Sequence, residues 1–186
     1  AQHIGANRVN VIERVAKPIQ WIKKEFPEAM ISLDTFRGNV AKVGIDNGAD
    51  IINDISGYQF DDQLLDVVAE NKMPYILMHV APQINNMHVS SENDNLYRDM
   101  IFYFSSKLQE LSSRGIKDVI IDPGFGFSKT LEQNYDLLSN LELFDILERP
   151  ILVGISRKSM ICKKLNIDAE NALNGTTILN TQAILK

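Results

Sequence analysis

The sequence predicts a parallel α/β fold, a (β/α)8 barrel of the TIM-barrel type in which about five of the eight strands are present. Short apolar, β-branched runs alternate with amphipathic stretches, which is the order of a parallel sheet with right-handed helical crossovers. Polar and glycine-rich residues follow the runs, and the carboxyl ends of the strands carry the chemistry in such barrels. An open doubly wound sheet would place a site only around its switch point. Because polar or glycine-rich residues follow all five runs, the sequence favours the barrel.

The five runs are too short for helices and are apolar on both faces, as expected for strands buried between a barrel interior and covering helices. They are Met30–Leu33, Asp50–Asn53, Tyr75–Met78, Val119–Ile121 and Ile151–Val153. The stretches before, between and after them predict helices at about Val9–Lys24, Asn39–Asn47, Gln63–Asn71, Leu96–Arg114, Tyr135–Leu147 and Ala172–Lys186. In the longest of these, Met100, Phe104 and Leu111 recur at helical spacing along one face.

A chain of 186 residues predicts one domain. Five strands do not close a barrel of eight, and only a helix precedes the first predicted strand, whereas a helical run ends the sequence. We therefore expect residues 1–186 to form a single barrel domain that lacks the first two strands and the last one. An unclosed parallel sheet would expose unpaired edges.

Composition excludes several classes of partner. The net charge is −5 and no stripe of Lys and Arg interrupts it, so nucleic acid is not an expected partner. No apolar run approaches the roughly 20 residues that span a bilayer, so we expect no membrane association. The single cysteine, Cys162, excludes an internal disulfide framework and indicates a reducing compartment, the cytoplasm.

Carboxylate and amide side chains stand at the ends of three predicted strands. Asp34 and Asp122 follow buried runs, and Asn53 ends the run between them. A carboxylate there is partly desolvated and can accept two parallel N–H bonds from a guanidine-like ring edge. Asn53 can both donate and accept. Each residue alone fits a helix cap or a turn, but together they favour a heterocycle-binding site.

The string DPGFGF, residues 122–127, is the most specific local feature. Its glycines allow close approach of the backbone to a ligand. Phe127 is a candidate to cover an aromatic ring, whereas Phe125 is expected to pack beneath its neighbours. A phosphate-binding GxxxxGK[ST] loop is a weak alternative, because Lys129 comes too late.

The string GISRKS, residues 154–159, follows the last predicted strand and precedes a helix. Anions are favoured at helix N-termini, so Ser159 is a candidate for a substrate carboxylate, and Arg157 and Lys158 add positive charge. Alternatively, Ser156 or Ser159 is merely the helix N-cap.

The other titratable residues predict no catalytic group. His79 follows the third run and is expected to be structural. No His, Cys and Asp cluster has zinc spacing, and no Ser-His-Asp arrangement can be argued from spacing. Met78 lies close enough to a strand end to line a pocket.

Four strings, SLDTFR, INDIS, DPGFGF and GISRKS, together resemble the dihydropteroate synthase family from about Met30 to Lys186. The resemblance implies a transferase of folate biosynthesis that condenses 6-hydroxymethyl-7,8-dihydropterin diphosphate with p-aminobenzoate. The products would be 7,8-dihydropteroate and diphosphate. It also implies Mg²⁺ as cofactor, a homodimeric full-length protein and sensitivity to sulfonamides as a drug target.

Carried onto matching positions, the resemblance assigns two sets of binding residues and no catalytic residue. The pterin-binding set is Asp34, Asn53, Ile55, Met78, Asp122, Gly126, Phe127 and Lys158. The p-aminobenzoate-binding set is Arg157, Lys158 and Ser159. The family's usual Mg²⁺-associated loop, its flexible second loop and its diphosphate-gripping pair have no counterpart in residues 1–186. We therefore expect no metal ligand here and no turnover by this stretch expressed alone.

Two alternatives stay open. A methyltetrahydrofolate-dependent methyltransferase uses a similar barrel with comparable Asp and Asn residues, but would not need SRKS. A non-catalytic pterin-binding fragment would keep affinity without turnover.

Overall fold

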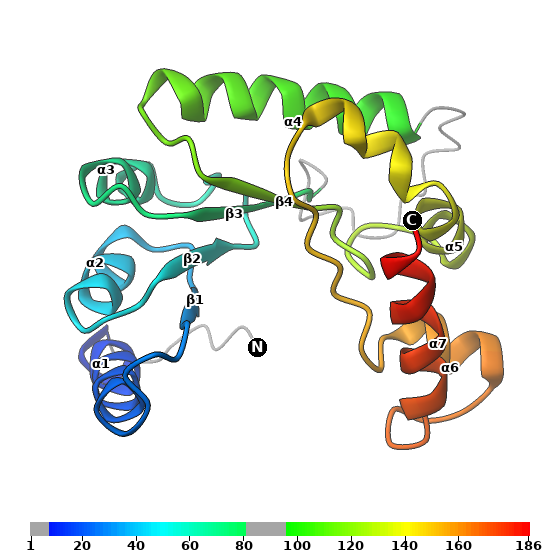
Figure 1. The fold of residues 1–186 in the computed structure, drawn as a ribbon, viewed down its shortest axis with the longest axis horizontal. Coiled ribbons are helices and arrows are strands. Elements are labelled where there is room, and N and C mark those ends of the chain that lie inside the picture. Colours follow the sequence, from blue (N-terminus) through cyan, green and yellow to red (C-terminus); the bar gives the residue numbers. More distant parts are fainter. Residues whose placement is uncertain (1–7, 81–95) are drawn as a thin grey trace. The chain divides into compact units, whose positions relative to one another are not determined.

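The computed structural model describes residues 8–80 and 96–186 and contains one parallel sheet (Figure 1). Its strands are β1 (Ser32–Asp34), β2 (Ile51–Asp54), β3 (Tyr75–Met78) and β4 (Val119–Asp122), in the order β1-β2-β3-β4. Chain order and spatial order coincide because a helix crosses over between successive strands. The predicted parallel α/β fold is confirmed.

Helices occupy each stretch in which the sequence predicts one. They are α1 (Arg8–Glu25), α2 (Gly38–Asp46), α3 (Gln63–Glu70), α4 (Leu96–Ser113), α5 (Leu131–Ser139), the 3₁₀ helix η2 (Leu141–Leu147), α6 (Ser159–Leu165) and α7 (Leu173–Ile184). None of the helices within the described ranges combines the length and the apolar character that crossing a bilayer requires.

The chain divides into two compact units, residues 1–77 with 108–120 and residues 78–107 with 121–186. In the first unit α1 packs against α2, and α2 packs against α3. Close packing of α2 on β1 depends on Gly44, where an added Cβ would lie 2.1 Å from Leu33 Cδ2. The parallel register of β1 and β2 places Asp34 beside Asn53.

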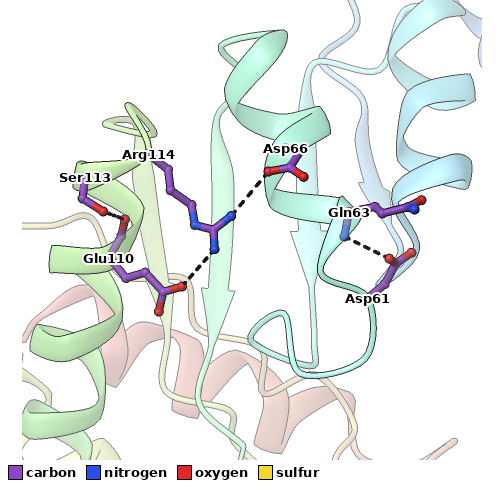
Figure 2. A network of polar contacts seen from close by, with 6 residues as sticks. All are labelled: Asp61, Gln63, Asp66, Glu110, Ser113 and Arg114. Atoms are coloured by element: carbon purple, nitrogen blue, oxygen red, sulfur yellow. Dashed lines mark hydrogen bonds and ion pairs between the residues drawn. The ribbon is translucent and has the colours of Figure 1, made fainter.

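A polar network links α3 to the last turn of α4 within the first unit (Figure 2). Arg114 lies 3.4 Å from Asp66 Oδ1 and 3.5 Å from Glu110 Oε1, and the Ser113 hydroxyl donates to Glu110 O. These charges are exposed, so each pair contributes at most about 1 kcal/mol to stability. The network thus joins α3 to the end of α4 at the surface of the unit, and it does not involve the carboxyl ends of the strands.

In the second unit, the prediction of a single helix at Tyr135–Leu147 is wrong, because two elements, α5 and η2, occupy this stretch. Helix α5 begins at a capping box formed by Thr130 and Gln133, and it ends at Asn140. Asn140 has φ −126° and ψ 34°, and its side chain donates to Asp136 O (3.0 Å). The backbone therefore leaves the helical conformation at Asn140, although its own N–H still donates to Asp136 O (3.1 Å), and η2 follows as a separate element.

The prediction of a full fifth strand at Ile151–Val153 is also wrong. One parallel bridge pairs Ile121 with Ile151, with bonds from Ile121 N to Pro150 O (2.9 Å) and from Leu152 N to Ile121 O (2.8 Å). Pro150 has no N–H to donate. Within residues 8–80 and 96–186 no strand pairs with the other side of this run, so the bridge to Ile121 is its one link to the sheet there.

Candidate functional site

The residues that the sequence selects for binding fall into both units, and each lies at or just after a strand or at the start of α6. The first unit holds Asp34, Asn53 and Ile55. The second unit holds Met78, Asp122, Gly126, Phe127, Arg157, Lys158 and Ser159. Each group is therefore built by its own set of contacts.

In the first unit, Asp34 and Asn53 stand side by side at the carboxyl ends of β1 and β2. Asn53 Oδ1 is buried and has no hydrogen-bond partner among the described residues. A buried acceptor without a donor is costly, which makes it a candidate for a ligand contact. Partial desolvation raises the pKa of Asp34, and the negative charge of Asp54 acts in the same direction.

Asp54 shapes the loop that follows β2, although the sequence analysis did not select it. Its side chain is fully buried. Oδ1 accepts from Ser56 N (2.8 Å) and Ser56 Oγ (2.7 Å), and Oδ2 accepts from Tyr58 N (2.6 Å) and Tyr75 OH (2.6 Å). These four bonds fix the backbone on either side of Ile55, a half-buried residue. Asp54 thus positions Asn53 and Ile55.

In the second unit, the loop after β4 folds back on the strand end. Asp122 Oδ1 accepts from Gly124 N (2.8 Å), and the buried Asn134 accepts from Gly126 N (2.7 Å). Phe125 is fully buried, whereas Phe127 keeps 38% of its surface exposed. Burial raises the pKa of Asp122, while the Gly124 N–H and the nearby lysines oppose that rise. The loop therefore presents one carboxylate and one accessible ring.

Lys158 contacts two residues of this loop, Phe125 and Phe127. Its ammonium donates to Phe125 O and lies 4.8 Å from the Phe127 ring centroid. An added Cβ at Gly126 would lie 3.1 Å from Lys158 Cδ, so a side chain at position 126 would crowd the lysine. Burial lowers the pKa of Lys158, and the Asp122 carboxylate opposes this effect. The structure thus brings Gly126, Phe127 and Lys158 together.

The SRKS turn adopts a strained conformation that a buried hydroxyl stabilises. Arg157 has φ 52°, in the left-handed region, and its N–H donates to Thr176 Oγ1 (2.9 Å). The Thr176 hydroxyl in turn donates to Ala172 O (2.8 Å). The N-cap of α6 is Lys158, which makes no side-chain cap bond, and Ser159 is the first helical residue. The alternative in which Ser156 or Ser159 is the N-cap is therefore wrong.

Replacing Thr176 by Val should lower the free energy of unfolding by about 1–3 kcal/mol, because the Arg157 N–H would lose its acceptor. Urea unfolding of the two proteins measures the difference. The matched control is Thr177→Val, an exposed position on the same helix, which should change stability by less than about 0.5 kcal/mol. Equal effects of the two substitutions would contradict the role of Thr176.

Lys129 is a second residue that sequence reasoning missed, because it was weighed only against a phosphate-loop pattern. Its ammonium lies 3.2 Å from His79 Nδ1, and it donates to Gly124 O (3.1 Å) and Phe127 O (3.2 Å). The His79 ring packs edge-on against Tyr103, with 4.9 Å between centroids. Met78 is buried, and its carbonyl accepts from the Tyr103 hydroxyl (2.9 Å).

Within the described ranges, no group of three or more His, Cys, Asp or Glu side chains is arranged to hold a metal ion. The carboxylates at the strand ends are instead engaged with backbone N–H groups, or stand beside an amide as Asp34 does. Among the described residues these carboxylates do not converge in the way that a resident Mg²⁺ would require.

Comparison with known proteins finds relatives that match nearly the whole chain. A family model described as pterin binding enzyme matches residues 3–186. Dihydropteroate synthase of Clostridium beijerinckii is 37% identical over 177 residues, which cover 94% of this chain and 63% of that protein. The synthase of Synechocystis is 39% identical over 167 residues, covering 87% and 57%. The Yersinia pestis synthase, solved with a sulfonamide drug complex, has a TM-score of 0.90 at 31% identity, over 96% of this chain and 65% of that one.

The chain thus spans about three fifths of the length of the curated relatives that it matches. The similarity to the Yersinia pestis structure confirms the predicted fold class. The match of the family model over residues 3–186 shows that the chain belongs to the pterin binding enzyme family.

Proposed function

We propose that the complete protein to which this chain belongs is a dihydropteroate synthase. It would condense 6-hydroxymethyl-7,8-dihydropterin diphosphate with p-aminobenzoate to give 7,8-dihydropteroate and diphosphate. The observation that carries the proposal is the contact between the DPGFGF loop and the SRKS turn, made when Lys158 reaches Phe125 O and the Phe127 ring. The relatives that bear this enzyme's name support it.

The proposed pterin site uses the polar and aromatic groups at the strand ends. Asp122 would accept two N–H bonds from the guanidine-like edge of the pterin ring. The unpartnered Oδ1 of Asn53 would accept another, and Asp34 would face the same ring. Lys158 would donate to a ring acceptor. The apolar lining would come from Ile55, Met78, Gly126 and Phe127.

The proposed p-aminobenzoate site lies at the SRKS turn. Ser159 would hydrogen-bond the substrate carboxylate, and Arg157 and Lys158 would supply positive charge. The Thr176 hydroxyl holds the backbone N–H of Arg157, so the turn from which Arg157 and Lys158 project is formed before substrate arrives. Such preorganisation lowers the cost of binding an anion.

In the proposed reaction, the C–O bond between the pterin methylene carbon and diphosphate breaks, and diphosphate leaves with the electron pair. The aniline nitrogen then bonds to the methylene carbon and loses a proton. Asp34 and Asp122 would stabilise the positive charge that develops on the pterin, an electrostatic contribution to catalysis. Mg²⁺, homodimer formation, sulfonamide sensitivity and a cytoplasmic location are proposed for the complete protein, and no step here depends on them.

The test follows radiolabelled p-aminobenzoate into dihydropteroate with the complete encoded protein. Product that depends on dihydropterin diphosphate would support the proposal. Pterin binding without product would favour the non-catalytic alternative. Methyl transfer from methyltetrahydrofolate, with no incorporation of p-aminobenzoate, would favour the methyltransferase.

Replacing Asp122 by Asn should weaken pterin binding about 10- to 150-fold, because one charge-assisted bond worth about 1.5–3 kcal/mol is lost. Calorimetric titration with 6-hydroxymethylpterin measures the change. The control is Asp145→Asn in η2, an exposed carboxylate of the same unit, which should bind like the parent protein. Unchanged affinity in the Asp122 variant would remove that residue from the site.

A further inference from the structure

Lys129 makes three hydrogen-bond contacts from one ammonium group. The acceptors are His79 Nδ1 at the end of β3 and the carbonyls of Gly124 and Phe127 in the loop after β4. A protonated lysine has three N–H donors and no acceptor, so the three contacts use its full capacity. The group therefore ties Gly124 and Phe127 of the loop to His79, the residue that follows β3.

We infer that Lys129 is a positioning residue, whose charged ammonium holds residues 122–127 against His79 and so presents Asp122 and Phe127 to the pterin. The inference rests on the proposed function, since it concerns the geometry of the same site. Lys129 itself would not touch the substrate. Its effect would pass through the loop that carries the carboxylate and the ring.

His79 is suited to accept from a cation. Its ring is fixed by an edge-on contact with Tyr103 and a tilted contact with Phe104, with 6.1 Å between the latter centroids. Burial and the positive charge of Lys129 lower the pKa of His79 to about 3. The imidazole is therefore neutral at physiological pH. Because an ammonium can only donate, the contact assigns the acceptor role to Nδ1 and the ring proton to Nε2.

The three contacts of Lys129 with His79, Gly124 and Phe127, which we call the clamp, require its side chain to be a protonated ammonium. Burial and the positive charge of Lys158 lower the pKa of Lys129 to about 8, although the Asp122 carboxylate opposes them. A neutral amine has only two N–H donors, and its lone pair would face an acceptor. The charged form prevails below pH 8, so the clamp should weaken as pH rises through that value. His79, Asp122 and Lys158 are the titratable groups that bear on Lys129 from β3, β4 and the start of α6.

The test compares Lys129→Met with the parent complete protein between pH 6.5 and 9.5, with 6-hydroxymethylpterin as the probe. At pH 7 we expect about tenfold weaker binding by the variant. The ratio of the two dissociation constants should fall toward one above pH 8, because the parent then loses its own ammonium. Taking the ratio cancels the titration of the pterin. The control Lys163→Met, at an exposed position of α6, should match the parent throughout.

A packing role alone would give a ratio that is independent of pH, and that result, or a ratio of one at pH 7, would overturn the inference. Hydrogen exchange of the parent protein decides the matter without any variant or ligand. Protection of the Gly126 and Phe127 amides should decrease between pH 7 and 9 relative to amides of α5. Constant relative protection would contradict the clamp, whereas failure of the parent to bind pterin would count against the proposed function alone.

Discussion

Replacing Asp54 by Ala should destabilise the protein by about 3–5 kcal/mol, one of the largest effects expected of any single substitution here. The carboxylate is fully buried and accepts four hydrogen bonds, from two donors of Ser56, the Tyr58 N–H and the Tyr75 hydroxyl. Alanine would leave these donors facing a cavity. Water can satisfy some of them, which keeps the loss below the sum of four separate penalties.

Urea unfolding followed by circular dichroism measures this loss. The matched control is Asp62→Ala, an exposed residue at the start of α3 that makes no side-chain cap bond, and it should change stability by less than about 0.5 kcal/mol. Tyr75→Phe removes one of the four donors to Asp54, so its loss of stability should lie between those of the Asp54 and Asp62 variants. Coincident unfolding curves for the Asp54 and Asp62 variants would show that the four hydrogen bonds to Asp54 do not stabilise the fold.

Replacing Gly124 by Ala should weaken pterin binding at least about 100-fold, because the loop after β4 would have to move. Gly124 has φ 72°, which costs an alanine about 1–2 kcal/mol. The added Cβ would also lie 2.4 Å from the carbonyl oxygen of His79, a backbone atom that cannot yield easily. Displacement of Gly124 would carry the Asp122 carboxylate with it.

Gly115→Ala is the matched control for this substitution. Gly115 also has a positive φ, 85°, but an added Cβ there would meet nothing within 4 Å. It should therefore show the conformational penalty alone, with unchanged pterin affinity in a calorimetric titration. Equal pterin affinity in the two alanine variants would show that the approach of Gly124 to His79 does not position the site.

The sequence predicted the elements that depend on local patterns. The four runs that became β1 to β4 are apolar and β-branched, and the helices between them have regular apolar faces, so both kinds of signal lie within one element. The predicted fifth strand failed because pairing depends on a neighbour, and only Ile151 found one. The helix predicted at Tyr135–Leu147 failed because the backbone leaves the helical conformation at Asn140, a break that the spacing of apolar residues on either side does not signal.

The contacts that position the candidate site could not be predicted in the same way. Asp54 meets the Tyr75 hydroxyl across 21 residues, and Lys129 meets His79 across 50. Neither pair has a characteristic spacing, since each forms only when the folded sheet brings neighbouring strands and the loops after them together. Asp122 and Lys158, by contrast, belong to strings that stand out on their own, so the sequence selected them directly.

The central proposal is that Asp34, Asn53, Asp122 and Lys158 bind one pterin ring. A crystal structure of the complete encoded protein with 6-hydroxymethylpterin bound tests it most directly. We expect the ring within hydrogen-bonding distance of all four side chains, with Asn53 Oδ1 accepting from a ring N–H and the Phe127 ring beside it. A pterin bound elsewhere, or these side chains pointing to different faces of the protein, would contradict the claim.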